Sequence, residues 1–172
     1  LGKGLGNGVP VSAAVGRADI MAHMSFGEAS DTWSANPISC AAVLATLDEF
    51  ESTNVMEQTQ KLNEIFTAGL LKLKESPIIA KIRGEGLVYG VECAPVGEHT
   101  GGDVANAIVK ECYLGESDGD GIHLLGALAT KVLRVSPPMT MTEEQAHTSL
   151  ELFTRLIQRT AEKLQPEAAV SN

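Results

Sequence analysis

A lysine near the start of the chain is the first residue whose surroundings could support chemistry. Lys3 stands among four glycines within the first eight residues, directly before the small apolar segment Val9 to Val15. Glycines leave room for a lysine side chain to project into a cleft, and a desolvated lysine amine becomes a nucleophile toward carbonyl compounds. A lysine in a glycine-rich loop is, more commonly, a solvated surface charge. The pattern therefore makes Lys3 a candidate nucleophile and leaves the surface alternative open.

Two further side chains have chemistry suited to anionic ligands. Thr32 lies in a polar loop just before Asn36-Pro37, and its hydroxyl can donate to a phosphate oxygen. Arg134 lies in a short apolar run before Pro137-Pro138, and its guanidinium can bind a carboxylate through two parallel hydrogen bonds. The alternatives are an ordinary loop residue for Thr32 and a structural ion pair at a domain interface for Arg134.

The histidines, cysteines and acidic turn show no pattern of metal ligands. The acidic turn from Glu116 to Asp120 lacks the full ligand series and terminal bidentate glutamate of a calcium loop, so we predict a solvated loop. The histidines lack ligand spacing, and the cysteines, odd in number and widely spaced, predict reduced core thiols in a cytoplasmic protein. These residues are His23, His99, His123, His147, Cys40, Cys93 and Cys112.

Composition excludes two classes of partner. The net charge is −9, and aromatic residues make up only 4% of the chain. Nucleic-acid readers need a basic face and stacking rings, so we expect no nucleic-acid partner. Apolar runs such as residues 40–47 are far shorter than the roughly 20 residues of a membrane-spanning helix, so we expect no membrane span.

Hydrophobic periodicity and capping residues predict elements that alternate between helix and strand. Asn36 can cap a helix whose first residue is Pro37, and Thr142 with Gln145 forms a capping box before a long amphipathic pattern. The first part is predicted as a strand at 9–15, a helix at 17–24, a loop at 25–34 and a helix from Pro37 whose apolar residues include Ala41, Leu44, Leu47 and Phe50. The rest is predicted as a helix at 54–75, a turn at 83–86, a strand at 87–91, a helix capped by Asp103, strands at 122–125 and 131–135, a helix capped by Thr142 and a frayed tail after Pro166.

Four motifs, in order, resemble those of one enzyme family. The family is the class III (omega) aminotransferases, pyridoxal-phosphate enzymes of the fold-type I group, and the resemblance covers nearly the whole chain. In the second motif Ser34-Ala35 stands where many relatives have two glycines. The motifs are Lys3-Gly-Leu-Gly-Asn-Gly-Val-Pro-Val-Ser-Ala-Ala-Val-Gly-Arg17, Thr32-Trp-Ser-Ala-Asn-Pro37, Ile82-Arg-Gly-Glu-Gly-Leu87 and Leu133-Arg-Val-Ser-Pro-Pro138.

The resemblance implies a role for each candidate residue. Lys3 would form a Schiff base with pyridoxal 5′-phosphate and then act as the general base and acid of a proton shift, while the cofactor supplies the electron sink. Thr32 would bind the cofactor phosphate, usually from the partner subunit of a homodimer. Arg134 would bind a carboxylate of the amino-acid or 2-oxo-acid substrate. Arg83 is interpreted mainly as structural, in a turn that packs the small domain on the large one.

The implied fold is the carboxyl-terminal part of an α/β, fold-type I enzyme. Residues 1–76 would be the remainder of the large cofactor domain with a connecting helix, and residues 77–172 a small α+β domain with a mainly antiparallel sheet. The family's phosphate cradle, its ring-stacking aromatic residue and the acid that pairs with the pyridinium nitrogen belong to its amino-terminal half. None of them is in this chain, so we expect it to be a poor enzyme alone.

The substrate is the least determined part of this interpretation. The segment Val15 to Met21 and the Leu133 motif favour amino transfer from 4-aminobutyrate or another omega-amino acid to a 2-oxo acid, with alanine-glyoxylate-type enzymes a close second. The alternative is a standalone α/β chain with a structural or association role and no catalysis. In either case, apolar surface exposed by a partial fold predicts self-association.

Overall fold

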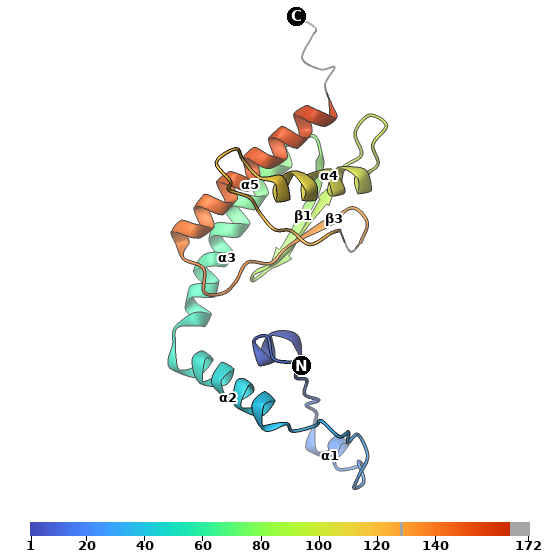
Figure 1. Ribbon diagram of the computed structural model, residues 1–172, viewed down its shortest axis with the longest axis vertical. Helices are drawn as coiled ribbons and strands as arrows, with labels where there is room; N and C mark the ends of the chain where they lie inside the picture. The colour runs from blue at the N-terminus through green and yellow to red at the C-terminus, as the bar shows by residue number, and fades with distance from the viewer. Residues whose placement is uncertain (128, 166–172) are drawn as a thin grey trace, which may run out of the picture. The chain divides into compact units, whose positions relative to one another are not determined.

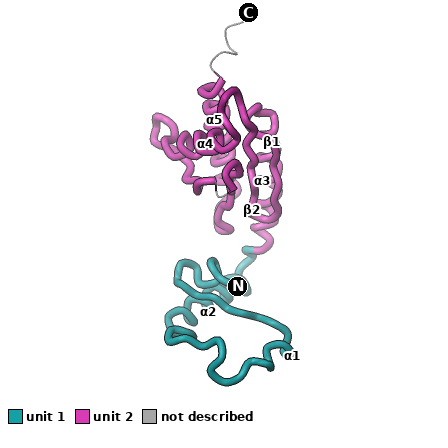
Figure 2. The backbone as a smooth tube through the Cα atoms, turned by 90° about the vertical axis from the view of Figure 1, so that its right-hand side faces the viewer, with its two compact units in different colours: residues 1–55 teal, residues 56–172 magenta. Residues whose placement is uncertain are grey.

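The computed structural model describes residues 1–127 and 129–165, and they form two compact units. The first unit comprises Leu1–Val55, and the second comprises the chain from Met56 onward. Figure 2 shows the two units in different colours. The fold is mixed α/β with one small antiparallel sheet, as predicted. The predicted tail after Pro166 lies outside the described residues.

The first unit is built from two short helical turns and one longer helix. A 3-10 turn, η1 (Lys3–Gly6), is followed by α1 (Ala18–Met21) and α2 (Pro37–Ser52). The start of α2 follows the prediction, because the Asn36 side chain accepts a hydrogen bond from the Ile38 backbone at 3.0 Å and proline occupies the first helical position. The Ser39 hydroxyl donates to the Pro10 carbonyl at 3.3 Å, which joins α2 to the segment after η1.

One sequence prediction about this unit is wrong. Residues 9–15 form no strand, and their longest-range backbone hydrogen bond joins Ala13 to Leu1 at 3.0 Å. A strand needs a neighbouring strand to satisfy its backbone, and an apolar segment without one stays extended but irregular. The helix predicted from Pro37 is present as α2, and none of its residues is buried, with Leu44 61% exposed.

The second unit contains a three-stranded antiparallel sheet in the order β1-β2-β3 (Figure 1). β1 spans Ile79–Glu85, β2 spans Val88–Cys93 and β3 spans Val132–Val135. The turn between β1 and β2 is two residues later than predicted, because the residues from Arg83 to Glu85 pair with β2. The strand predicted at 122–125 is wrong: residues 122–125 are described and form no strand.

Three helices cover one face of this sheet. They are α3 (Val55–Lys72), which continues into the 3-10 turn η2 (Leu73–Glu75), α4 (Gly101–Leu114) and α5 (Glu143–Leu164). The core side chains alternate along the strands and recur at helical spacing. The largest fully buried side chains include Leu62 and Leu70 from α3, Val91 from β2, Ile108 from α4, Leu133 from β3 and Leu156 and Ile157 from α5.

The helix caps explain where these helices begin. Thr142 and Gln145 form the predicted capping box of α5, with side-chain to backbone distances of 2.9 and 3.1 Å. The predicted cap of α4 is wrong by three residues. Thr100 is the cap, and Asp103 completes the box by accepting from the Thr100 backbone at 2.9 Å.

Two other expectations concern the domain boundary and membrane-spanning helices. The boundary at residue 76 refers to the large and small domains of the complete family fold, so it stays a prediction; the observed units divide at residue 55. Across the described residues, no helix has the length and apolar character that crossing a membrane requires.

Candidate functional site

Lys3 lies in the first turn of the first unit, in a backbone conformation unusual for its type. It begins η1, its side chain is exposed, and its φ of +51° falls in the left-handed region. That conformation costs a non-glycine residue about 1 kcal/mol or more, and such conformations cluster at functional sites. The turn is closed by backbone hydrogen bonds from Leu5 to Gly2 and from Asn7 to Gly4, both 3.1 Å long. The glycine-rich sequence therefore folds into a defined turn that presents the lysine.

Thr32 lies in a loop that Asp31 organises. The Asp31 carboxylate accepts from the Ser34 hydroxyl and from the Trp33 backbone, each at 2.7 Å. These two hydrogen bonds, the Ser34 bond first, lower the pKa of Asp31. Ala35 adopts a left-handed φ of +54°, which glycine adopts without strain. Thr32 is exposed, and its hydroxyl makes no hydrogen bond to any residue in the described ranges, so it is free to donate to a ligand.

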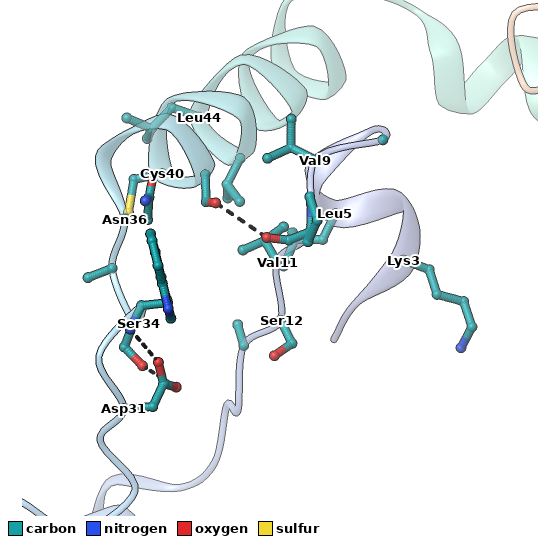
Figure 3. Close-up of a pocket in the computed structure, with 17 residues that line it drawn as sticks. Lys3, Leu5, Val9, Val11, Ser12, Asp31, Ser34, Asn36, Cys40 and Leu44 are labelled. Atoms are coloured by element: carbon teal, nitrogen blue, oxygen red, sulfur yellow. Dashed lines mark hydrogen bonds between the residues drawn. The ribbon is translucent and has the colours of Figure 1, made fainter.

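An open cavity of about 1050 Å³ lies between the segment after η1 and the start of α2 (Figure 3). Asn36 and Cys40 line it on one side and Val9 and Val11 on the other (Figure 3), and Trp33 is a further lining residue. Lys3 lies at its edge, with its side chain directed away from the other labelled lining residues (Figure 3). Thr32 does not line it. The first unit thus places Lys3 beside a cavity but does not close a pocket around both candidate residues.

Arg134 belongs to the second unit, where it lies on the face of the sheet opposite to the helices. Its neighbours in β3, Leu133 and Val135, pack toward the core, whereas Arg134 itself is exposed. In register, Arg134 lies opposite Gly90 of β2, and Gly90 lies opposite Arg83 of β1. No carboxylate of the described residues lies within ion-pair distance of Arg134. Its guanidinium is therefore available to an external anion.

An ion-pair cluster lies beside Arg134 on the same sheet. The Glu92 carboxylate accepts from Lys131 at 2.8 Å and from Arg83 at 2.7 Å. These two cations, Lys131 first, lower the pKa of Glu92 from 4.5 to about 2. Glu92 is therefore ionised at neutral pH and is already shared by two cations. No sequence prediction included this cluster, and the signal for it was the alternation of charged residues along β1, at Lys81, Arg83 and Glu85.

The cysteines and histidines form no further site. Cys93 and Cys112 are buried, and burial raises their pKa to about 11 and about 12. Cys40 is exposed, so its predicted core position is wrong. Within residues 1–127 and 129–165, no group of three or more histidine, cysteine or acidic side chains could hold a metal ion.

Comparisons with known proteins identify the family. The family described as "Aminotransferase class-III" matches residues 1–157. The chain is 30% identical over 156 residues to an ornithine aminotransferase of Emericella nidulans, and 33% identical over 165 residues to an alanine/serine racemase of Pyrococcus horikoshii. A crystal structure of the ornithine aminotransferase from Toxoplasma gondii ME49 superimposes with a TM-score of 0.79 at 26% identity over 94% of the chain. The chain therefore belongs to the class III aminotransferases, as the motifs predicted.

The chain spans only about a third of these relatives. It covers 32% of the Emericella protein and 33% of the Pyrococcus protein, although 89% and 92% of the chain itself is matched. It likewise covers 37% of the Toxoplasma structure. Ornithine, acetylornithine and 4-aminobutyrate aminotransferases are all among its relatives. Membership of the family thus does not select one substrate.

The class III aminotransferases use pyridoxal 5′-phosphate, and the residues of this chain fit that cofactor in part. Lys3 offers an amine and Thr32 an uncommitted hydroxyl, which suit an aldehyde carbon and a phosphate oxygen respectively. The cavity beside Lys3 is open, and the lysine side chain points away from it (Figure 3). The donor chemistry is therefore present, but the first unit alone does not enclose the cofactor.

Proposed function

We propose that this chain is the part of a class III aminotransferase that supplies the cofactor lysine and the substrate carboxylate site. The reaction is the transfer of an amino group between an amino acid and a 2-oxo acid. The observation that carries the proposal is the placement of Lys3. It is exposed, has a left-handed backbone conformation in a glycine-rich turn, and lies within the residues that match the family.

The described residues would divide the work between binding and proton transfer. When bound, pyridoxal phosphate supplies the electron sink of the reaction. Lys3 would hold the cofactor and then carry a proton on Nζ. The Thr32 hydroxyl would donate to the phosphate, in a homodimer from the partner subunit. Arg134 would bind the substrate carboxylate and so orient the reacting amine.

We propose an omega-amino acid such as 4-aminobutyrate as the amino donor. An exposed guanidinium at Arg134 suits a terminal carboxylate, and 4-aminobutyrate enzymes are among the relatives. The relative named as an alanine/serine racemase makes racemisation the second candidate. Both reactions need a lysine that moves a proton, so Lys3 alone does not separate them. The three free cysteines support a reducing compartment such as the cytoplasm.

The test is an amino-transfer assay of this chain joined to the remaining two thirds of the family fold. We expect amino acid to form from a 2-oxo acid with 4-aminobutyrate as donor, and Lys3→Ala to abolish it. Lys72→Ala, which removes an exposed lysine at the end of α3, is the matched control and should leave the rate unchanged. Full transfer by the Lys3→Ala protein would refute the proposal. Inversion of alanine without transfer would establish the racemase alternative instead.

A further inference from the structure

The open face of the small sheet carries a second arginine in register with Arg134. Because side chains alternate across a strand, Arg83, Gly90 and Arg134 lie on the same face of the three neighbouring strands. Adjacent strands are about 5 Å apart, so the two arginine backbones are about 10 Å apart, with only glycine between them. Two long guanidinium side chains can both reach a small group above that glycine.

Gly90 leaves room for the Arg83 side chain over the middle strand of the sheet. A Cβ atom at this position would lie 3.2 Å from Val132 Cγ1, 3.7 Å from Arg83 Cγ and 3.9 Å from Arg83 Nε. An added methyl group would therefore press on Val132 and lie in van der Waals contact with Arg83, on the floor between the two arginines. We call this floor, with Gly90 at its centre and an arginine on each neighbouring strand, the cradle.

The charges around this cradle favour an anion. The chain as a whole has a net charge of −9, yet the cradle has an arginine on each side. Among the residues that the structure describes, the only carboxylate paired with either arginine is Glu92, and it is shared between Arg83 and Lys131. Arg83 uses Nη1 for that bond, and it has further N–H donors on a rigid planar group. Glu92 therefore fixes the Arg83 side chain without neutralising the cluster.

We propose that Arg83 is a second arginine of the substrate site, so that one carboxylate binds above Gly90 to both Arg83 and Arg134. The inference rests on the proposed function for its substrate class, a carboxylate-bearing amino acid or oxo acid. It changes the interpretation of Arg83 from a purely structural turn residue to a binding residue. Glu92 and Lys131 are then positioning residues that hold the Arg83 guanidinium over the sheet.

A carboxylate titration of the chain tests the proposal without cofactor or catalysis. Butyrate is the probe and uncharged butyramide its control, and the Nε–Hε NMR signals of the two arginines are followed. We expect both signals to shift with butyrate, with one common dissociation constant, and neither to shift with butyramide. The Lys3→Ala chain should bind butyrate equally well, so failure of the amino-transfer proposal is distinguishable from failure of this one.

Four variants separate a shared site from general electrostatic attraction. Arg83→Gln should weaken butyrate binding about fivefold, and Arg83→Lys, which keeps the charge near Glu92 but loses the planar fork, about threefold. Gly90→Ala should weaken it about threefold although both arginines remain. Arg17→Gln removes an exposed arginine that pairs with Asp19 in the first unit, and it should have no effect. Amide spectra confirm that each variant retains the fold.

Three results would overturn the inference. The first is the absence of any arginine shift up to about 100 mM butyrate, which is weaker than any useful site. The second is an affinity for butyrate that is unchanged in both Arg83 variants, which would leave Arg134 as the only arginine that binds the carboxylate. The third is an equal loss of affinity in Arg17→Gln, which would reduce the effect to net charge.

Discussion

Replacing Gly84 by alanine should destabilise the small sheet far more than the same change at Gly86. The two glycines belong to one motif and lie two residues apart, at the end of β1 and in the turn before β2. Both have positive φ, +155° at Gly84 and +62° at Gly86. They differ in their surroundings, because a Cβ at Gly84 would overlap the Val88 carbonyl oxygen and lie 2.7 Å from Tyr89 Cα, whereas a Cβ at Gly86 would meet nothing within 4 Å.

Those contacts determine how much more free energy of unfolding is lost in Gly84→Ala than in Gly86→Ala. Gly86→Ala incurs only the cost of a left-handed alanine, about 1 kcal/mol. Gly84→Ala adds an overlap with backbone atoms that cannot rotate away, which is worth about 2 kcal/mol more. Tyr89 holds that backbone in place, since its hydroxyl lies 2.7 Å from both the Asn63 side-chain oxygen and the Gly86 carbonyl. The expected loss at Gly84 is therefore about 3 kcal/mol in the free energy of unfolding.

Thermal unfolding followed by circular dichroism measures the contrast directly. For a domain of this size, 1 kcal/mol lowers the midpoint by about 4 °C, so we expect a drop of about 12 °C for Gly84→Ala and about 4 °C for Gly86→Ala. The unmodified chain and the Gly86 variant serve as the matched controls. Equal midpoints for the two variants would refute the described register of β1 on β2, and with it the placement of Arg83 opposite Gly90.

Further predictions concern the ion pairs and thiols of the second unit. Glu111→Gln should reduce the free energy of unfolding by about 1 to 2 kcal/mol, since the nearly buried carboxylate accepts from the half-exposed Lys163 at 2.8 and 2.9 Å. Because Lys163 lowers the Glu111 pKa, this contribution is complete above the unfolded pKa of about 4.3 and is lost as the pH falls through the lower folded pKa. Urea titrations at several pH values should show that the free energy of unfolding of the unmodified chain falls as the pH falls through this range. The same fall in Glu111→Gln would contradict the prediction. A thiol reagent should label Cys40 rapidly and label Cys93 and Cys112 only on unfolding; fast labelling of all three would disprove the described core.

Local sequence signals predicted the helices well because caps and helical periodicity are properties of neighbouring residues. Asn36-Pro37 and the Thr142 capping box begin α2 and α5 as expected, and the buried face of α5 follows the predicted spacing. The extended segments were harder. Residues 9–15 have the apolar composition of a strand, but in the described unit they have no strand to pair with. A strand depends on a partner that is distant in sequence, so composition alone cannot establish it.

The candidate site shows the same limit. Lys3, Thr32 and Arg134 could be selected from their types and the family motifs, but the relation of Arg83 to Arg134 could not. It depends on which residue of β2 lies between them, and a slip by one residue would move every side chain to the other face. An irregularity in the pairing of β1 between Ile79 and Lys81 shifts that register, and no sequence pattern predicted it.

The most direct test of the account is the site of covalent cofactor attachment. The chain, joined to the rest of the family fold, is loaded with pyridoxal phosphate, reduced with borohydride and mapped by peptide mass spectrometry. We expect one label per chain, on Lys3, and no label on that peptide in Lys3→Ala. In the chain by itself only weak, scattered labelling is expected, because the first unit does not enclose a cofactor around Lys3. A stoichiometric label on any other lysine of the joined protein would contradict the account.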